Sequence, residues 1–318
     1  MAAGGLDASA PSRRGESRAS ASTRGRGSLL TLITDRHFLL MAAWPSLAAM
    51  LLVTAIPFAA TLGLSLTDYD LVRSDTWRFI GAANFLELLR DRQTGRIVFN
   101  TLYLVVGTTL IDTLVGLGLA LLMEGAWRGL RMIRTLYLLP IMTAPVVVAL
   151  CWRAMFANGA GWINYGLGLL HLPQPVWLGD PALAMPAVII SDMWTGVPFQ
   201  AVLLLAGLLG VPVELKEAAQ ADGANPWQVF WHVTLPSIRP VLTVAVILKF
   251  IDSFRKFEGI QLLTTGGPGI ASTTLNLHIF VTGLTYDRVG YAAAFGVVMI
   301  LLIGVSVGVL FGGMRRLA

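Results

Sequence analysis

The chain alternates between long apolar runs and short polar segments. Six runs are long enough to cross a bilayer, because a spanning helix needs about 20 predominantly apolar residues. We expect these runs at about 38–66, 97–123, 135–156, 182–210, 236–257 and 289–312. They are too long and too uniformly apolar for the strands of a membrane barrel. The pattern therefore predicts an all-α membrane protein with six transmembrane helices.

The sequence before the first run has a different composition. Residues 1–34 are rich in Ala, Ser, Gly and Arg, and such a segment cannot bury enough apolar surface to become ordered. A cleaved secretory signal is disfavoured, because the apolar run from Phe38 is long enough to span. We expect three regions: a disordered basic segment at 1–34, the first transmembrane helix and outer loop at 35–95, and a transmembrane domain at 96–318 with a polar loop at 211–240.

Basic residues predict the orientation in the membrane, because Lys and Arg are enriched on the cytoplasmic side. With the amino terminus inside, the inner segments carry the amino-terminal arginines and most of the other basic residues next to the runs. The outer segment 67–96, which contains several arginines, is an exception. The distribution places both termini and the loop 211–240 in the cytoplasm.

Composition agrees with a membrane protein and excludes several other classes. The chain of 318 residues is 55% hydrophobic and only 13% charged, and a soluble domain has about twice that charged fraction. The net charge of +5 is scattered and accompanies no nucleic-acid-reading motif, so we expect a lipid bilayer and no nucleic acid as partner. Cys151 is the only cysteine, and the four histidines show no metal-ligand spacing, so we expect no metal site.

The polar loop 211–240 carries the strongest local signals. Pro212 suits the start of a helix, and Gly223 suits its end in a left-handed conformation. Asn225 with Gln228 predicts a capping box for a second short helix, which Leu235-Pro236 should stop.

The second loop helix has an aromatic face formed by Trp227, Phe230 and Trp231. Amphipathicity alone leaves two interpretations open. The face either folds back on the chain's own membrane helices or docks into a groove of a partner protein.

The spacing of Glu217-Ala-Ala, Asp222-Gly-Ala and Leu235-Pro resembles the EAA loop of binding-protein-dependent ABC importer permeases. The resemblance extends over about 100–294 and is nearest to the sugar branch, with its maltose-like and sn-glycerol-3-phosphate-like permeases. It implies the type I ABC importer permease fold, in which this loop forms coupling helices seated in a cleft of a cytoplasmic ATPase. The residues that it assigns to this coupling are Glu214, Glu217, Ala218, Ala219, Asp222, Gly223, Ala224, Trp227, Phe230, Leu235 and Pro236.

The resemblance also implies partners and a location. These are a second permease subunit in a heterodimer, two copies of an ABC ATPase and an extracytoplasmic solute-binding protein, at the bacterial inner membrane. Residues 264–268 and the threonines that follow are similar to the larger maltose-type subunit, although the extra spans and large outer domain of that subunit are missing here. None of the three lysines stands in a phosphate-binding loop, so we expect ATP and Mg on the ATPase chains and no cofactor on this one.

Polar groups inside the runs mark a candidate solute path. Lys249, Asp252 and Lys256 can pair along one helix face, and we expect Lys249 to pair with Asp252. Pro186, Gly196 and Pro198 predict a broken fourth span, which would either expose backbone to a cargo or serve packing alone. The family resemblance favours the path, with candidates Asp192, Trp194, Thr195, Phe199, Gln200, Asp252, Ser253 and Phe254.

The sequence thus predicts the permease subunit of an ATP-driven importer, forming half of a path for a sugar or sugar-like solute, and not an enzyme. The main alternative is an ion-coupled secondary transporter with Asp112, Asp192 and Asp252 as relays. That alternative leaves the Glu217 loop unexplained. A membrane-embedded enzyme would need a paired acid or metal motif, which the sequence does not show, and an exporter permease agrees with the basic amino-terminal segment but much less with the loop.

Overall fold

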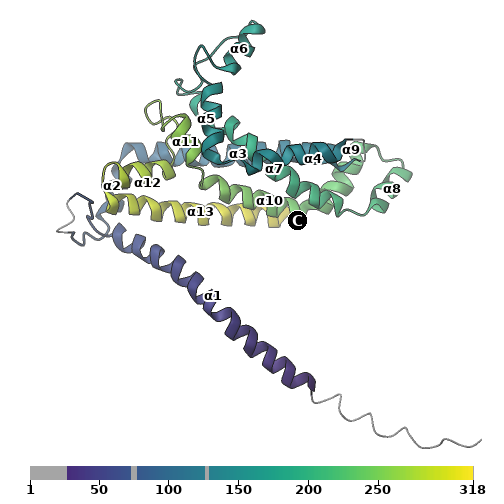
Figure 1. The fold of residues 1–318 in the computed structure, drawn as a ribbon, viewed down its shortest axis with the longest axis horizontal. Coiled ribbons are helices and arrows are strands. Elements are labelled where there is room, and N and C mark those ends of the chain that lie inside the picture. The colour runs from purple at the N-terminus through teal and green to yellow at the C-terminus, as the bar shows by residue number, and fades with distance from the viewer. Residues whose placement is uncertain (1–26, 73–76, 126–128, 318) are drawn as a thin grey trace, which may run out of the picture. The chain divides into compact units, whose positions relative to one another are not determined.

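A computed structural model describes residues 27–72, 77–125 and 129–317 (Figure 1). Within these ranges the chain is helical, with one isolated antiparallel bridge between Thr67 and Phe79. From the amino-terminal side, the first elements are α1 (Gly27–Ser65), α2 (Ala83–Arg90), α3 (Arg92–Glu124), α4 (Leu130–Leu138), η2 (Leu139–Met142), α5 (Pro145–Met155), α6 (Trp162–Leu169) and α7 (Ala184–Leu209). The remaining elements are α8 (Val213–Ala221), α9 (Pro226–Val229), η3 (Phe230–Thr234), α10 (Leu235–Phe254), α11 (Glu258–Leu263), α12 (Leu275–Leu284) and α13 (Val289–Leu317).

The chain divides into two compact units, residues 1–59 and 60–318. The first unit holds most of α1, whose stretch Ala43–Ser65 is long and apolar enough to span a membrane. Helix α1 begins at Gly27, inside the segment 1–34 for which composition predicts no order. Residues 1–26 of that predicted segment lie outside the described residues.

Five helices of the described ranges pass the length and hydropathy requirements for a span, and a bent pair makes a sixth. The bent pair replaces the straight third span expected at 135–156. Its two parts, Met132–Met142 and Pro145–Met155, meet at an angle of 96°. The cause is local: Thr143 and Ala144 are extended, and Ala144 precedes Pro145, which disfavours helical geometry at the residue before it.

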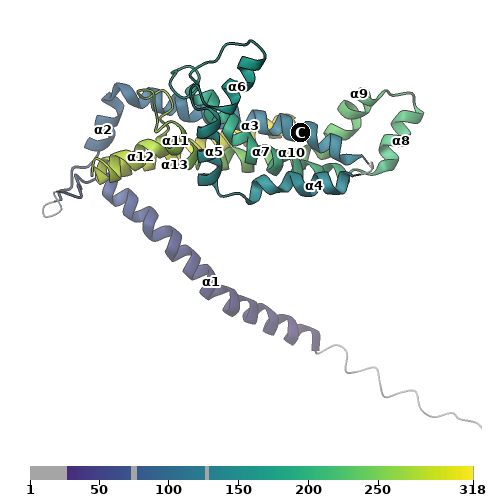
Figure 2. The ribbon, with the colours of Figure 1, turned by 45° about the horizontal axis from the view of Figure 1, so that its top comes forward.

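Helices α3, α7 and α10 form the centre of the second unit. Their buried apolar side chains make one cluster that includes Ala120, Leu204, Leu208 and Ile238. Helices α8 and α9 lie at one end of this bundle, and α2 and α12 lie at the opposite end (Figures 1 and 2).

Helix α7 runs without a break from Ala184 to Leu209, so the predicted interruption of the fourth span is wrong. Pro186 lies in the first turn, where a missing N–H removes no helical hydrogen bond. Pro198 lies inside the helix, which nevertheless continues through it.

Candidate functional sites

Residues 213–234, which comprise α8, α9 and η3, form an elbow at one end of the bundle (Figure 2). Gly223 has a φ of +88°, and its N–H donates to the carbonyl of Gln220 while the next N–H donates to that of Ala219. These bonds close the last turn of α8 as a Schellman motif. Asn225 and Gln228 each accept a hydrogen bond from the other's backbone N–H, which completes the predicted capping box. Both local predictions are confirmed.

The second loop helix does not stop at Leu235-Pro236, which corrects the sequence prediction. Residues Pro226 to Phe254 form one continuous helix that passes through the wide turn η3. Pro236 falls in the first turn of α10, directly after η3. We attribute the tolerance of this proline to the wide turn, which already departs from the regular α-helical hydrogen-bond pattern. The elbow is therefore joined rigidly to a membrane span.

The elbow exposes an aromatic cluster formed by Trp227, Phe230 and Trp231, whose ring centroids lie 5.3–5.9 Å apart. Trp227 is 68% exposed and Trp231 48% exposed. Helix α8 has no buried residue, although Lys216 forms an ion pair with Glu124 at the end of α3. Within the described chain this cluster is not covered by membrane helices, which favours docking to a partner over folding back.

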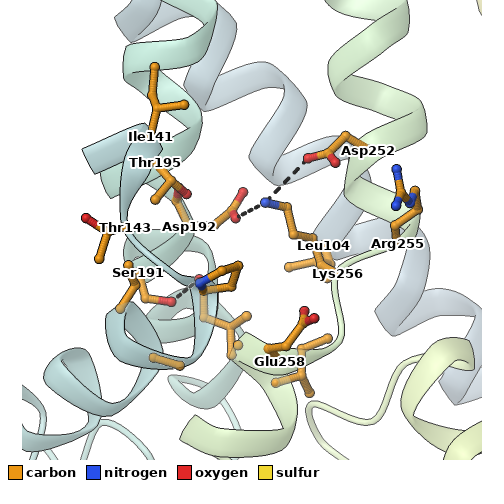
Figure 3. Close-up of a pocket in the computed structure, with 16 residues that line it drawn as sticks. Leu104, Ile141, Thr143, Ser191, Asp192, Thr195, Asp252, Arg255, Lys256 and Glu258 are labelled. Carbon is orange, nitrogen blue, oxygen red and sulfur yellow. Dashed lines mark hydrogen bonds and ion pairs between the residues drawn. The ribbon is translucent and has the colours of Figure 1, made fainter. Parts of the chain in front are cut away.

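A polar pocket of about 330 Å³ lies deeper in the bundle, between α3, α5, α7, α10 and α11 (Figure 3). Three predicted path residues, Asp192, Thr195 and Asp252, line it. Figure 3 shows Lys256 bonded to both Asp192 and Asp252 across one wall. Apolar side chains such as Leu104 and Ile260 complete the lining, so the pocket offers both charged and apolar contacts.

Five charged side chains form a chain of ion pairs from the buried interior to this pocket. Lys249 Nζ lies 2.6 Å from Asp112 Oδ2 and 2.8 Å from Asp192 Oδ2. Lys256 Nζ lies 2.7 Å from Asp192 Oδ1 and 3.4 Å from Asp252 Oδ2. The expected Lys249–Asp252 pairing is therefore wrong: Asp252 pairs with Lys256, because tertiary packing brings two carboxylates from other helices to Lys249.

Exposure rises steadily along this chain of ion pairs. The side chains of Asp112 and Lys249 are 0% and 2% exposed, that of Asp192 is 10% exposed, and that of Asp252 is 50% exposed. Lys256 follows the end of the α10 helix. Burial opposes its positive charge, but the carboxylates of Asp192 and Asp252 outweigh this effect and raise the pKa of Lys256 above its ordinary value.

Gly196 makes this arrangement sterically feasible. A Cβ at this position of α7 would collide with Asp112 Oδ2 and lie 2.7 Å from Lys249 Nζ. Gly196 is therefore needed because the ion pair lies against this position of α7, and it does not mark a break in the helix.

The other predicted path residues lie away from the pocket. Gln200, fully buried, donates hydrogen bonds to Thr113 Oγ1 and to the Ala245 carbonyl, so it links α7 to α3 and α10. Ser253 and Phe254 are also buried in the bundle. Two more predicted residues, Trp194 and Phe199, are 51% and 41% exposed, and neither lines the pocket.

Several pocket residues were missing from the sequence-based candidates. Arg255, Lys256 and Glu258 all line the pocket. Their position at the end of the fifth apolar run was the available signal, because charges at the end of a span can turn back into the bundle. Among the described residues, no group of three or more His, Cys, Asp or Glu side chains is arranged to hold a metal ion.

Comparison with known proteins gives consistent results for sequence and structure. Residues 112–316 match the family described as "Binding-protein-dependent transport system inner membrane component". The chain is 35% identical over 236 residues to the trehalose/maltose transport system permease protein MalF of Thermococcus litoralis, covering 74% of this chain and 80% of that protein. It is 33% identical over 243 residues to the trehalose transport system permease protein SugA of Mycobacterium tuberculosis, covering 76% and 78%.

The fold is similar to that of a chain in a solved bacterial ABC transporter involved in the import of the acidic polysaccharide alginate. The TM-score is 0.76 with 25% identity, covering 91% of this chain and 99% of the other. A second structure of an alginate ABC transporter, in complex with a periplasmic protein bound to an alginate pentasaccharide, gives a TM-score of 0.78 at 24% identity, covering 91% and 98%.

Proposed function

Since this chain belongs to the family of binding-protein-dependent transport system inner membrane components, we propose that it forms half of the path by which an ABC importer carries a sugar or sugar-like solute. The chain is a multi-pass inner-membrane permease subunit and not an enzyme. Its relatives named for trehalose, maltose and diacetylchitobiose transport support a carbohydrate cargo.

One observation carries the proposed mechanism: a single continuous helix joins the elbow to the pocket. It begins at Pro226, passes the exposed aromatic cluster and ends at Phe254, just beyond the pocket residue Asp252. A force applied to the elbow therefore reaches the pocket without a flexible hinge. In this mechanism a cytoplasmic ATPase grips the elbow, and ATP-driven closure of two ATPase copies reorients α10 relative to α7.

The complete transporter, in this proposal, contains a second permease subunit, two ATPase chains that bind ATP and Mg, and an extracytoplasmic solute-binding protein. Both termini of this chain lie in the cytoplasm, on the same side as the elbow. The solute passes between the two permeases and contacts the pocket of this one. A volume of about 330 Å³ suits one sugar ring. Its carboxylates can accept hydrogen bonds from the sugar hydroxyls, and its apolar side chains can pack against the C–H face of the ring.

Reconstitution tests this function directly. The chain is assembled with its partners in proteoliposomes. Uptake of radiolabelled trehalose, maltose and diacetylchitobiose is measured with and without ATP on the side of the membrane that carries the ATPase. We expect uptake that needs ATP and the binding protein and that persists when an ionophore dissipates the proton and sodium gradients. Uptake that collapses with those gradients while ATP remains would instead support the ion-coupled alternative.

A further inference from the structure

The chain of ion pairs contains two residues that do not line the pocket, Asp112 and Lys249. Lys249 has a side chain that is 2% exposed and does not line the pocket, so a solute there cannot contact it. Its ammonium group nevertheless bonds to Asp192, which does line the pocket. The effect of Lys249 on a solute must therefore pass through Asp192.

We propose that Lys249, backed by Asp112, is a positioning residue that fixes the Asp192 carboxylate as a hydrogen-bond acceptor for the solute. This inference rests on the proposed function. Lys249 holds Oδ2 of Asp192 from behind at 2.8 Å, and Lys256 holds Oδ1 from the pocket side at 2.7 Å. With both oxygens held, the carboxylate cannot rotate, so its remaining lone pairs keep a constant direction for a sugar hydroxyl.

The surrounding structure supports a fixed Lys249. Asp112 balances its charge at 2.6 Å, which makes burial of the ammonium tolerable. Ser253 donates to the Lys249 carbonyl and accepts a hydrogen bond from Thr108, which ties this turn of α10 to α3. Gly196 leaves the space that the pair occupies.

A simpler role is an ion pair that only holds three helices together, and a double variant separates the two roles. Replacing Asp112→Asn together with Lys249→Met removes one charge of each sign and leaves no unpaired buried charge. If the pair were merely structural, this variant should transport with the wild-type KM. If Lys249 positions Asp192, the complex should still assemble, but KM for trehalose or maltose uptake should rise about tenfold while kcat changes little.

Asp192→Asn provides the second arm of the experiment. Because Lys249 acts through Asp192, adding this change to the double variant should raise KM no further than Asp192→Asn does alone. Additive increases would overturn the proposal, as would a wild-type KM in the double variant. If the double variant fails to assemble, Asp112→Asn with Lys249→Gln decides, because Gln is a polar, uncharged replacement for Lys249. KM should again rise if the Lys249 ammonium positions Asp192, and a wild-type KM in that variant would contradict the assigned role.

Gln200→Met is the matched control for lost packing. Gln200 links the same three helices through hydrogen bonds but does not line the pocket. We expect this variant to lower the Tm of the solubilised complex and leave KM unchanged. Wild-type uptake that needs neither ATP nor the binding protein would overturn the proposed function and this inference with it, whereas ATP-dependent wild-type uptake with an unaltered KM in the double variant would overturn the inference alone.

Discussion

In soluble proteins apolar side chains are usually buried and charged ones exposed. The elbow departs from this rule by exposing apolar side chains, and the ion-paired centre of the bundle departs from it by burying charged ones. At the elbow, Trp227 and Trp231 are apolar yet largely exposed. In the centre, Asp112 and Lys249 are charged yet buried. Exposed aromatic surface contributes favourable free energy only when a partner protein buries it. Buried charges, in contrast, need partners of opposite charge within the chain itself. The comparison favours a partner protein on the elbow, whereas in the centre Lys249 and its carboxylates form ion pairs within the chain itself.

The largest expected effect comes from disrupting the buried ion pair of Asp112 and Lys249. Gly196→Ala places a Cβ against Asp112 and Lys249, which should separate the pair and cost about 3–5 kcal/mol of stability. We expect poor assembly and a clearly lower Tm of the solubilised complex, measured by thermal unfolding. Gly118→Ala in α3 is the control, because its Cβ meets nothing within 4 Å and should be tolerated. Equal Tm values for the two variants would contradict the steric argument.

The next effect tests the exposed side. Trp227→Ala removes an aromatic side chain that is 68% exposed, so the stability of this chain should change little. Its affinity for the ATPase should nevertheless fall about 30-fold, as for an aromatic hot spot at an interface. The measurement is titration of the ATPase onto the permease in nanodiscs. Trp162→Ala on α6, which removes a side chain that is 75% exposed, should leave this affinity unchanged.

A smaller effect is expected from distorting the elbow without removing any contact. Gly223→Val forces a β-branched residue to a φ of +88°, at a cost of about 1–2 kcal/mol, although open space surrounds the site. We expect several-fold more ATP hydrolysed per solute carried, measured by parallel ATPase and uptake assays. Gly223→Asn should stay near the wild-type ratio, because Asn tolerates left-handed geometry. Unaltered coupling in the valine variant would show that the turn shape is unimportant.

The smallest effect concerns the capping box. Asn225→Ala removes one of its two hydrogen bonds and should cost about 1 kcal/mol of local helix stability. Faster amide hydrogen exchange confined to α9 and η3 would report this loss, with uptake reduced only slightly. Loss of protection throughout α10 would contradict a local role.

Sequence reasoning succeeded where the determining interactions are local. Asn225 and Gln228 are three residues apart, and Gly223 responds to its own backbone geometry, so the short-range pattern was sufficient. It failed where distant segments meet. The partners of Lys249 come from α3 and α7, and no spacing within α10 could reveal them.

The two span predictions failed for different reasons, one local and one tertiary. Pro145 did signal the sharp bend of the third span, but the apolar run on both sides of it concealed the break. Gly196 and Pro198 suggested a break in α7 that packing overrides.

Cysteine labelling tests the central claim, that the elbow is cytoplasmic and seats in a separate ATPase. Trp227→Cys is introduced after replacing Cys151, the only native cysteine, with Ala. A membrane-impermeant maleimide should label this cysteine in inside-out vesicles and not in right-side-out vesicles. Added ATPase should block the labelling when its concentration is raised enough to offset the roughly 30-fold weaker binding expected without the Trp227 side chain. Trp162→Cys on α6 should label from the opposite side regardless of ATPase. Labelling of residue 227 from outside, or labelling that the ATPase does not reduce, would contradict the account.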